Sequence, residues 1–186
     1  SVADIMMVFD MSGSMNNDGS IRKFGYFNSV EQSLDKTKVY YYNTNANTAS
    51  VTGNTYYSNP MIYVDGKWQY YNGSAWKTLS NNSNSMVYTW NSRITALKEA
   101  AIAFIKDTAS KSPNSKIGIT TFDGYIEYIG WNGYYATRGN EIQAITKVGS
   151  SPSSMIKAVS KITADGGTSP QKGLEKTKIQ LNSVKD

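Results

Sequence analysis

The run ADIMMVFD at residues 3–10, followed by the loop MSGSM at residues 11–15, decides the predicted fold. The run is short and almost continuously apolar, and the loop after it contains glycine. This combination predicts a strand buried on both faces, as in a parallel sheet. Open α/β sheets bind their ligands at the carboxyl ends of such strands, so the loop is also the first candidate for a functional site.

The segments downstream follow an α/β order. Apolar residues first recur at helical spacing and then form short, nearly continuous runs. We expect a helix from Ser92 to about 110–113, a strand at 116–122, an antiparallel partner at 125–131 beyond a turn at Asp123-Gly124, and helices at 140–148, at 153–162 and from Ser169. This order is an α/β pattern in which crossover helices join parallel strands.

Residues 16–91 differ in composition from the rest of the chain. They are rich in asparagine, serine and glycine, and they hold most of the 14 tyrosines. The segment KWQYYNGSAWK at residues 67–77 predicts a β-hairpin that turns at Asn72-Gly73, because Asn-Gly favours a type I′ turn. We therefore expect an inserted β-rich subdomain at 16–91, within a main domain formed by 1–15 and 92–186.

Missing residue types exclude several chemistries. The chain has 186 residues, a formal net charge of +5, and no cysteine or histidine. Disulfides, Ser–His triads and Cys- or His-ligated metals are therefore excluded, and we expect no enzymatic activity. A metal would need oxygen ligands, which favours Mg²⁺, Mn²⁺ or Ca²⁺. No apolar run approaches the ~20 residues of a membrane span, and the lysines are not clustered, so we expect neither membrane insertion nor nucleic-acid binding.

Oxygen-bearing side chains alternate in the loop after the first strand. Asp10, Ser12 and Ser14 offer one carboxylate and two hydroxyls from a single tight turn. Alternate residues of such a turn can point toward one centre, and these donors suit a hard cation that keeps positions open for a further ligand. The alternative is a polar turn that only caps the strand.

The motif DMSGSM at residues 10–15 resembles the Asp-x-Ser-x-Ser signature of von Willebrand factor A domains, their metal-ion-dependent adhesion site. The segments RITALKEA at 93–100 and IGITTF at 117–122 are similar to the first helix and the second strand of that family. GGTSP at 166–170 is similar to the loop that carries its second motif. The resemblance covers residues 1–15 and about 92–186, and it implies a doubly wound, mostly parallel α/β sheet for that part of the chain.

The resemblance implies a role for each matching residue. Ser12 and Ser14 would bind the ion directly, and Asp10 would bind through water or at the edge of the coordination shell. Thr168 would bind directly when a ligand is present and through water otherwise. In the family, an acidic side chain of the partner protein fills the remaining position.

One family motif is missing. The third motif is an aspartate, usually in a Thr-Asp-Gly context, and no Thr-Asp-Gly occurs in this sequence. The chain stops at Asp186, where the resemblance places the preceding strand. An apolar strand also needs neighbours on both edges and helices on both faces, which one hairpin and three helices cannot supply. We therefore expect a companion segment, from a split or cleaved domain, to complete the fold.

Metal-dependent adhesion is the function that the resemblance implies. The long insertion, rich in Asn, Tyr and Ser and lacking Cys, resembles those of pilus-tip and surface adhesins of Gram-positive bacteria. By this analogy we expect an extracellular protein of the bacterial cell surface, cell wall or pilus tip. Its partner would be a host or extracellular-matrix protein, bound through Mg²⁺ or, alternatively, Mn²⁺ or Ca²⁺.

Other interpretations stay open. The aromatic residues Trp68, Trp76, Tyr70 and Tyr71 could bind carbohydrate or a glycoprotein, with a purely structural metal, or could form the subdomain's core. The chain could also be a subunit of an intracellular metal-insertion assembly, where related domains occur. Among the remaining acids, Asp18 could hold a second cation or lie in a solvated turn. Asp123 could approach the metal or belong to a hairpin, and Asp165 starts a loop.

Overall fold

The computed structural model describes residues 1–16, 21–43, 59–80, 85–149 and 152–163. The chain divides into two compact units. Unit 1 comprises Ser1–Asn17 together with Ile102–Asp186, and unit 2 comprises Asp18–Ala101. The boundary between them falls inside helix α2 (Arg93–Lys111), which continues from unit 2 into unit 1.

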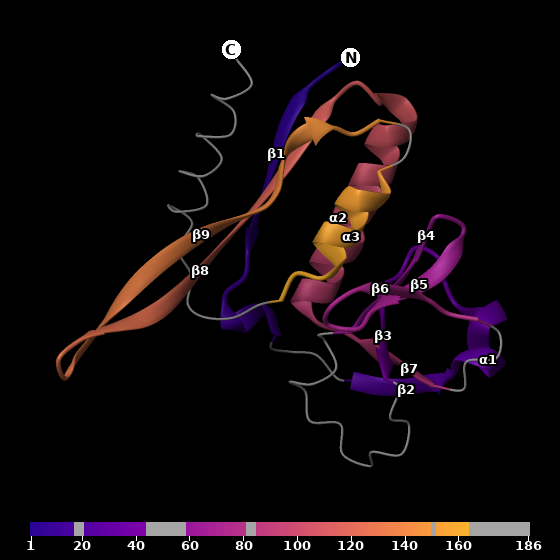
Figure 1. Ribbon diagram of the computed structural model, residues 1–186, viewed down its shortest axis with the longest axis horizontal. Coiled ribbons are helices and arrows are strands. Elements are labelled where there is room, and N and C mark those ends of the chain that lie inside the picture. The colour runs from indigo at the N-terminus through magenta and orange to yellow at the C-terminus, as the bar shows by residue number, and fades with distance from the viewer. Residues whose placement is uncertain (17–20, 44–58, 81–84, 150–151, 164–186) are drawn as a thin grey trace. The chain divides into compact units, whose positions relative to one another are not determined.

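Unit 1 contains a three-stranded sheet in the order β1-β8-β9. β1 (Asp4–Asp10) runs parallel to the first half of β8 (Lys116–Ile129), and their register ends with Asp10 opposite Phe122. β9 (Asn132–Lys147) pairs with β8 in the antiparallel direction along nearly the whole strand. Beyond the end of β1, β8 and β9 continue as a two-stranded ribbon, visible in Figure 1.

Unit 1 has a largely aliphatic core. Ile117 and Ile119 of β8 are fully buried, and α3 (Ser153–Ser160), which contacts β9, buries Met155, Ile156 and Val159. These three positions recur at helical spacing, so the sequence pattern that predicts the helix also selects its buried face. The 3₁₀ turn η1 (Gly13–Asn16) follows β1 and forms part of the loop with the candidate metal ligands.

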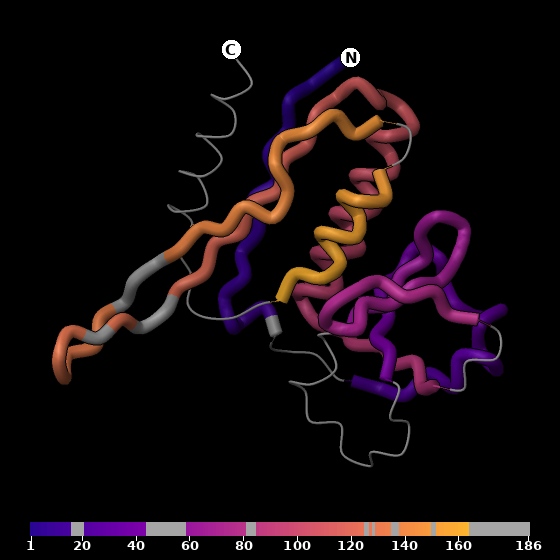
Figure 2. Tube along the Cα trace, viewed as in Figure 1, coloured from indigo at the N-terminus to yellow at the C-terminus, as the bar shows by residue number. Residues whose placement is uncertain are grey.

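Unit 2 is built on a six-stranded antiparallel sheet in the order β2-β7-β3-β4-β5-β6, curled into a half barrel. The tube in Figure 2 follows the chain through its turns. A short helix and a 3₁₀ turn come directly after the first of these strands. The bounds are β2 (Ile21–Tyr26), α1 (Phe27–Val30), η2 (Glu31–Ser33), β3 (Tyr40–Asn43), β4 (Pro60–Val64), β5 (Lys67–Tyr71), β6 (Trp76–Thr78) and β7 (Met86–Trp90).

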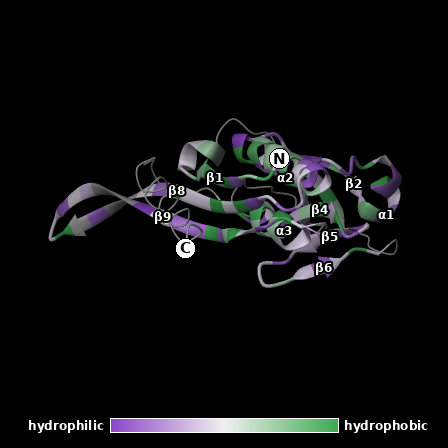
Figure 3. Ribbon diagram, turned by 90° about the horizontal axis from the view of Figure 1, so that it is seen from above, coloured by the Kyte–Doolittle hydropathy of each residue, from purple (hydrophilic) through white to green (hydrophobic). Residues whose placement is uncertain are grey.

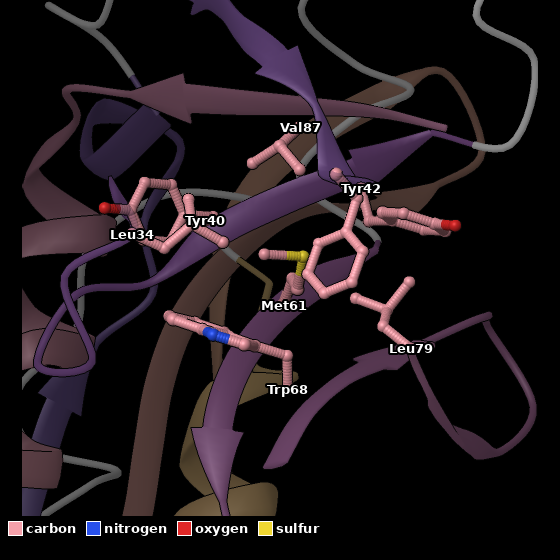
Figure 4. Close-up of a cluster of buried hydrophobic side chains, with 8 residues drawn as sticks. Leu34, Tyr40, Tyr42, Met61, Trp68, Leu79 and Val87 are labelled. Carbon is pink, nitrogen blue, oxygen red and sulfur yellow. The ribbon is translucent and has the colours of Figure 1, made fainter. Parts of the chain in front are cut away.

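Aromatic rings fill the core of unit 2. Tyr40 and Trp68 meet edge to face with ring centroids 5.7 Å apart, and Tyr42 and Tyr70 lie 4.4 Å apart. Large rings remove much apolar area from water, so they compensate for the small number of branched aliphatic residues in this region. Figure 4 shows this cluster, which consists of Phe27, Leu34, Tyr40, Tyr42, Met61, Trp68, Leu79 and Val87.

The predicted doubly wound, mostly parallel α/β sheet is wrong. The structure is β-rich, and β1–β8 is the only parallel pair among the described strands. The prediction required β1 to be buried on both faces, but its residues Ile5 to Val8 are only half-buried. A short apolar run is compatible with either sheet type, because the run does not specify which strands pair with it.

Two local predictions in unit 1 are also wrong. Residues 140–148 were expected to form a helix, but most of them belong to β9. The sequence also predicts a turn at Asp123-Gly124, whereas β8 continues through it to Ile129. The turn lies at Gly130-Trp131 instead, where Gly130 has φ +60°, a left-handed conformation that glycine adopts at little cost.

Several other predictions are confirmed. The strand at the start of the chain corresponds to β1, and the helices expected from Ser92 and at 153–162 correspond to α2 and α3. The hairpin at 67–77 corresponds to β5 and β6, but its loop spans residues 72–75 rather than two residues. Asn72 Oδ1 accepts hydrogen bonds from the N–H groups of Ser74 and Ala75, which stabilises this longer loop. The helix expected from Ser169 lies outside the described residues.

Candidate metal centre

The loop after β1 is held by hydrogen bonds at both ends. The Met11 N–H donates to the Phe122 carbonyl at 2.9 Å, which extends the β1–β8 ladder by one step. The Ser12 N–H donates to Asp10 Oδ1 at 2.8 Å, and the Met15 N–H donates to the Ser12 carbonyl at 3.0 Å. The bond from the Ser12 N–H to Asp10 Oδ1 closes an Asx turn, in which an aspartate side chain accepts from the backbone two residues further on. The backbone therefore turns tightly and fixes the Asp10 carboxylate against the loop.

The hydroxyl groups of Ser12 and Ser14 lie side by side. Their Oγ atoms are 3.0 Å apart, and either one can donate the hydrogen bond between them. Mg²⁺ binds oxygen ligands at 2.0–2.1 Å in octahedral geometry, so neighbouring ligands lie about 2.9 Å from one another. The Ser12–Ser14 separation therefore matches one edge of such an octahedron. Ser12 is only 2% exposed, whereas Ser14 is exposed to solvent.

The donor set is small and consists of hard oxygen ligands. Asp10 supplies a carboxylate, and its Oδ2 atom is not used in the bond from the Ser12 N–H. The described residues contain no group of three or more Asp and Glu side chains placed to hold a metal. A cation at this loop would therefore rely on one carboxylate, two hydroxyls and ligands from elsewhere. Thr168, the fourth predicted ligand, lies outside the described residues.

Asp123 forms an ion pair within the β8–β9 sheet and is not part of this loop. The Arg138 guanidinium donates to both of its oxygens, from Nε to Oδ1 at 2.7 Å and from Nη2 to Oδ2 at 2.8 Å. The two residues are direct cross-strand neighbours in β8 and β9. Since Asp10 is opposite Phe122, side-chain alternation directs Asp10 and Asp123 to opposite faces. Asp18 and Asp165 lie outside the described residues.

Unit 2 contains a buried polar cluster that the sequence analysis did not identify. The Tyr41 hydroxyl and Thr95 Oγ1 are 2.7 Å apart, and Ser92 Oγ donates to Thr95 Oγ1 at 2.9 Å. Burial raises the pKa of the Tyr41 hydroxyl. Ser92 also caps α2, because its Oγ accepts the Thr95 N–H at 3.2 Å. The expected start of a helix at Ser92 was the only sequence signal near this cluster.

Lys98 is the most unusual member of that region. Its side chain is 2% exposed, and its Nζ atom has no hydrogen-bond partner among the described residues. Nζ lies 5.9 Å from the centroid of the Tyr41 ring, and desolvation lowers the pKa of Lys98 to about 7. A lysine in a helical pattern normally indicates a solvated face, so no local pattern predicts this burial.

A cleft of about 300 Å³ lies beside the cluster, lined by residues that include Trp90, Ser92, Thr95 and Glu99. Its rim holds an ion pair in which Lys38 Nζ is 3.9 Å from Glu99 Oε2. Glu99 Oε1 also accepts the Val39 N–H at 3.2 Å. The polar groups of this cleft therefore bond largely to one another, which favours a structural role for them.

The chain matches no family model, no curated protein and no solved structure.

Proposed function

We propose that this protein is a metal-ion-dependent adhesin. A divalent cation, Mg²⁺ with Mn²⁺ or Ca²⁺ as alternatives, is bound by Asp10, Ser12 and Ser14 together with Thr168. An acidic side chain of a host or extracellular-matrix protein completes the coordination shell. The observation that carries the proposal is the 3.0 Å separation of the Ser12 and Ser14 Oγ atoms, which fits adjacent ligands of one octahedral ion.

The residues of the loop have distinct roles in this proposal. Ser12 and Ser14 contribute the paired hydroxyl ligands, and the Ser12 N–H orients the Asp10 carboxylate. The bound ion supplies a positive charge with an open position for a carboxylate ligand. The proposal requires a strand followed by a tight loop, and it does not depend on a doubly wound sheet. The resemblance of the 16–91 insertion to those of Gram-positive surface and pilus-tip adhesins supports a location at the bacterial cell surface, cell wall or pilus tip.

Magnesium binding by the full chain tests the proposal. Ser14→Ala removes one exposed hydroxyl, and Ser154→Ala makes the same change at an exposed position of α3 in the same unit. By isothermal titration calorimetry we expect Ser14→Ala to weaken Mg²⁺ binding by at least about tenfold, an effect typical of altered metal sites. Ser154→Ala should bind Mg²⁺ like the wild type. Equal affinities in all three proteins would refute the proposed site.

Carbohydrate binding is a second candidate, favoured by one observation in unit 2. Tyr71 and Trp76 are both partly exposed, and their ring centroids are 5.5 Å apart on neighbouring strands. Such a pair could stack on a sugar. Trp68, in contrast, is a core residue and cannot provide an exposed platform. Adhesion lost on adding EDTA supports the metal route, whereas adhesion lost only in Trp76→Ala supports the sugar route.

A further inference from the structure

The far end of the β8–β9 ribbon exposes large apolar side chains. The exposed fractions are 69% for Ile129, 101% for Trp131 and 43% for Tyr134. In Figure 3, which is coloured by hydropathy, the tip of this ribbon has one short hydrophobic stretch beside paler and hydrophilic residues. We call residues 129–134 the arm tip. Because soluble proteins rarely expose clustered large apolar residues without a use, the arm tip is a candidate contact surface.

The arm tip is carried well away from β1. The β1–β8 register stops at Phe122, and seven further residue pairs join β8 to β9, from Asp123–Arg138 to Ile129–Asn132. At ~3.4 Å per residue, these pairs extend about 24 Å. Among the described strands, none pairs with this part of the ribbon. Two-stranded hairpins are only marginally stable in water, so a contact that buries the arm tip would also stabilise the ribbon.

The composition of the arm tip is suited to a lipid interface. The stretch YIGWNGYYAT at residues 128–137 contains no charged residue, and the nearest charges are Glu127 and Arg138. Trp and Tyr, which combine an apolar ring with a polar group, are enriched where hydrocarbon meets lipid headgroups. An uncharged segment of this kind can enter that region without desolvating an ion.

The small area of the arm tip favours lipid over a protein partner. Ile129, Trp131 and Tyr134 together expose on the order of 400 Å². A stable protein–protein interface buries about 1,200–2,000 Å² in total, or about 600–1,000 Å² on each partner, which is more than these three side chains expose. Lipid, in contrast, can surround a projecting turn on every side. We propose that the arm tip anchors the protein reversibly in the interfacial region of a lipid bilayer.

This proposal differs from the sequence-based expectation of no membrane insertion. That expectation rested on the length of apolar runs needed to span a bilayer. None of the described helices has the length and hydropathy needed to cross a membrane. Interfacial anchoring needs only a few exposed side chains, and their exposure depends on where the hairpin turns. The proposal is independent of the metal centre, since no residue of the arm tip belongs to it.

Vesicle binding by the full chain tests the anchor. Zwitterionic phosphatidylcholine vesicles are used in EDTA, so neither anionic lipid nor a divalent cation can attract the protein. We expect the wild type to float with the vesicles and its tryptophan emission to shift to the blue, because Trp131 enters the interface while Trp68 and Trp90 are already buried. Trp131→Ser should lower the partition coefficient by about tenfold or more, and Trp131→Phe should lower it less.

Phe104→Ser is the matched control, because Phe104 is also an exposed large apolar residue but lies on α2. It should bind vesicles like the wild type. The proposal is overturned if the wild type does not bind these vesicles, if Trp131→Ser binds as well as the wild type, or if Phe104→Ser loses as much binding. Self-association that depends on Trp131, without vesicle binding, would assign the arm tip to a second copy and also overturn it.

Discussion

Unit 2 fills its interior with aromatic rings, whereas unit 1 has a largely aliphatic interior and leaves Trp131 fully in solvent. The same residue types therefore serve opposite purposes in the two units. In unit 2, Trp68 supplies core area to a segment poor in branched aliphatic residues, so its aromatic content is not by itself a sign of a binding surface. In unit 1, the exposed aromatic residue and the exposed Ser14 of the loop are the features that point to function.

Removing an aromatic side chain from the core of unit 2 should cause the largest loss of stability. Trp68→Ala should lower the free energy of unfolding by ~3–5 kcal/mol, because it leaves a large cavity between Tyr40 and Tyr63. Trp76→Ala, at a partly exposed position of the same sheet, should cost far less. Urea denaturation followed by circular dichroism measures both. Equal losses would show that Trp68 has no special role in the core.

Replacing Lys98 should change how the stability of the protein depends on pH, because unit 2 buries this ionisable side chain beside the Tyr41 ring. Its pKa is lowered from 10.5 to about 7 by desolvation, so below pH 7 the folded state bears the cost of a buried charge. As the pH rises from about 7 toward 10, the unfolded chain retains the proton that the folded chain has lost, and stability increases.

The measurement is the stability of wild type and Lys98→Met at about pH 6 and pH 9. Linkage predicts that the wild type gains on the order of 2–3 kcal/mol relative to Lys98→Met over this range. We expect Lys98→Met to be the more stable protein at the lower pH, since an apolar side chain of similar length fills the same space. Parallel pH profiles for the two proteins would contradict the burial of a neutral amine.

Breaking the Asp123–Arg138 ion pair, at the end of the ribbon nearest β1, should cause a smaller loss of stability. The Asp123 side chain is 8% exposed and that of Arg138 is 48% exposed. Arg138→Ala should cost ~1–2 kcal/mol of stability, a value reduced by solvent screening of the exposed guanidinium. Lys111→Ala breaks the Lys111–Asp107 pair, whose partners are both solvent-exposed, and should cause no measurable change in thermal unfolding. Similar effects for both variants would show that burial of Asp123 does not matter.

Local patterns predicted the individual elements better than their arrangement. Helical spacing identified α2 and α3, and the apolar runs identified β1 and the first half of β8. The continuation of β8 through Asp123-Gly124 was missed because the cross-strand pair with Arg138 outweighs the local turn preference. Most of the segment 140–148, which was expected to be a helix, is strand because it pairs with β8 along a long antiparallel ladder, and this tertiary pairing outweighs the local preference.

For the candidate site, too, the sequence predicts which residues lie near one another, whereas the fold sets their geometry. Asp10, Ser12 and Ser14 are close in sequence, so a loop of any tight geometry would keep them near one another. The 3.0 Å separation of the two serine hydroxyls and the turn that holds Asp10 are properties of the folded loop. Lys98 shows the opposite case, because only tertiary packing could bury a lysine that its own helix would leave in water.

The chemistry available to this protein follows from its composition and local motifs: oxygen ligands without cysteine or histidine, an Asp-x-Ser-x-Ser loop after an apolar strand, and an aromatic segment between 16 and 91. Which strands pair, where the long hairpin turns and which aromatic residue is left in solvent depend on the folded chain. The physical reason is that composition and local spacing act within a few residues. Pairing and burial, in contrast, are set by contacts between segments far apart in the chain.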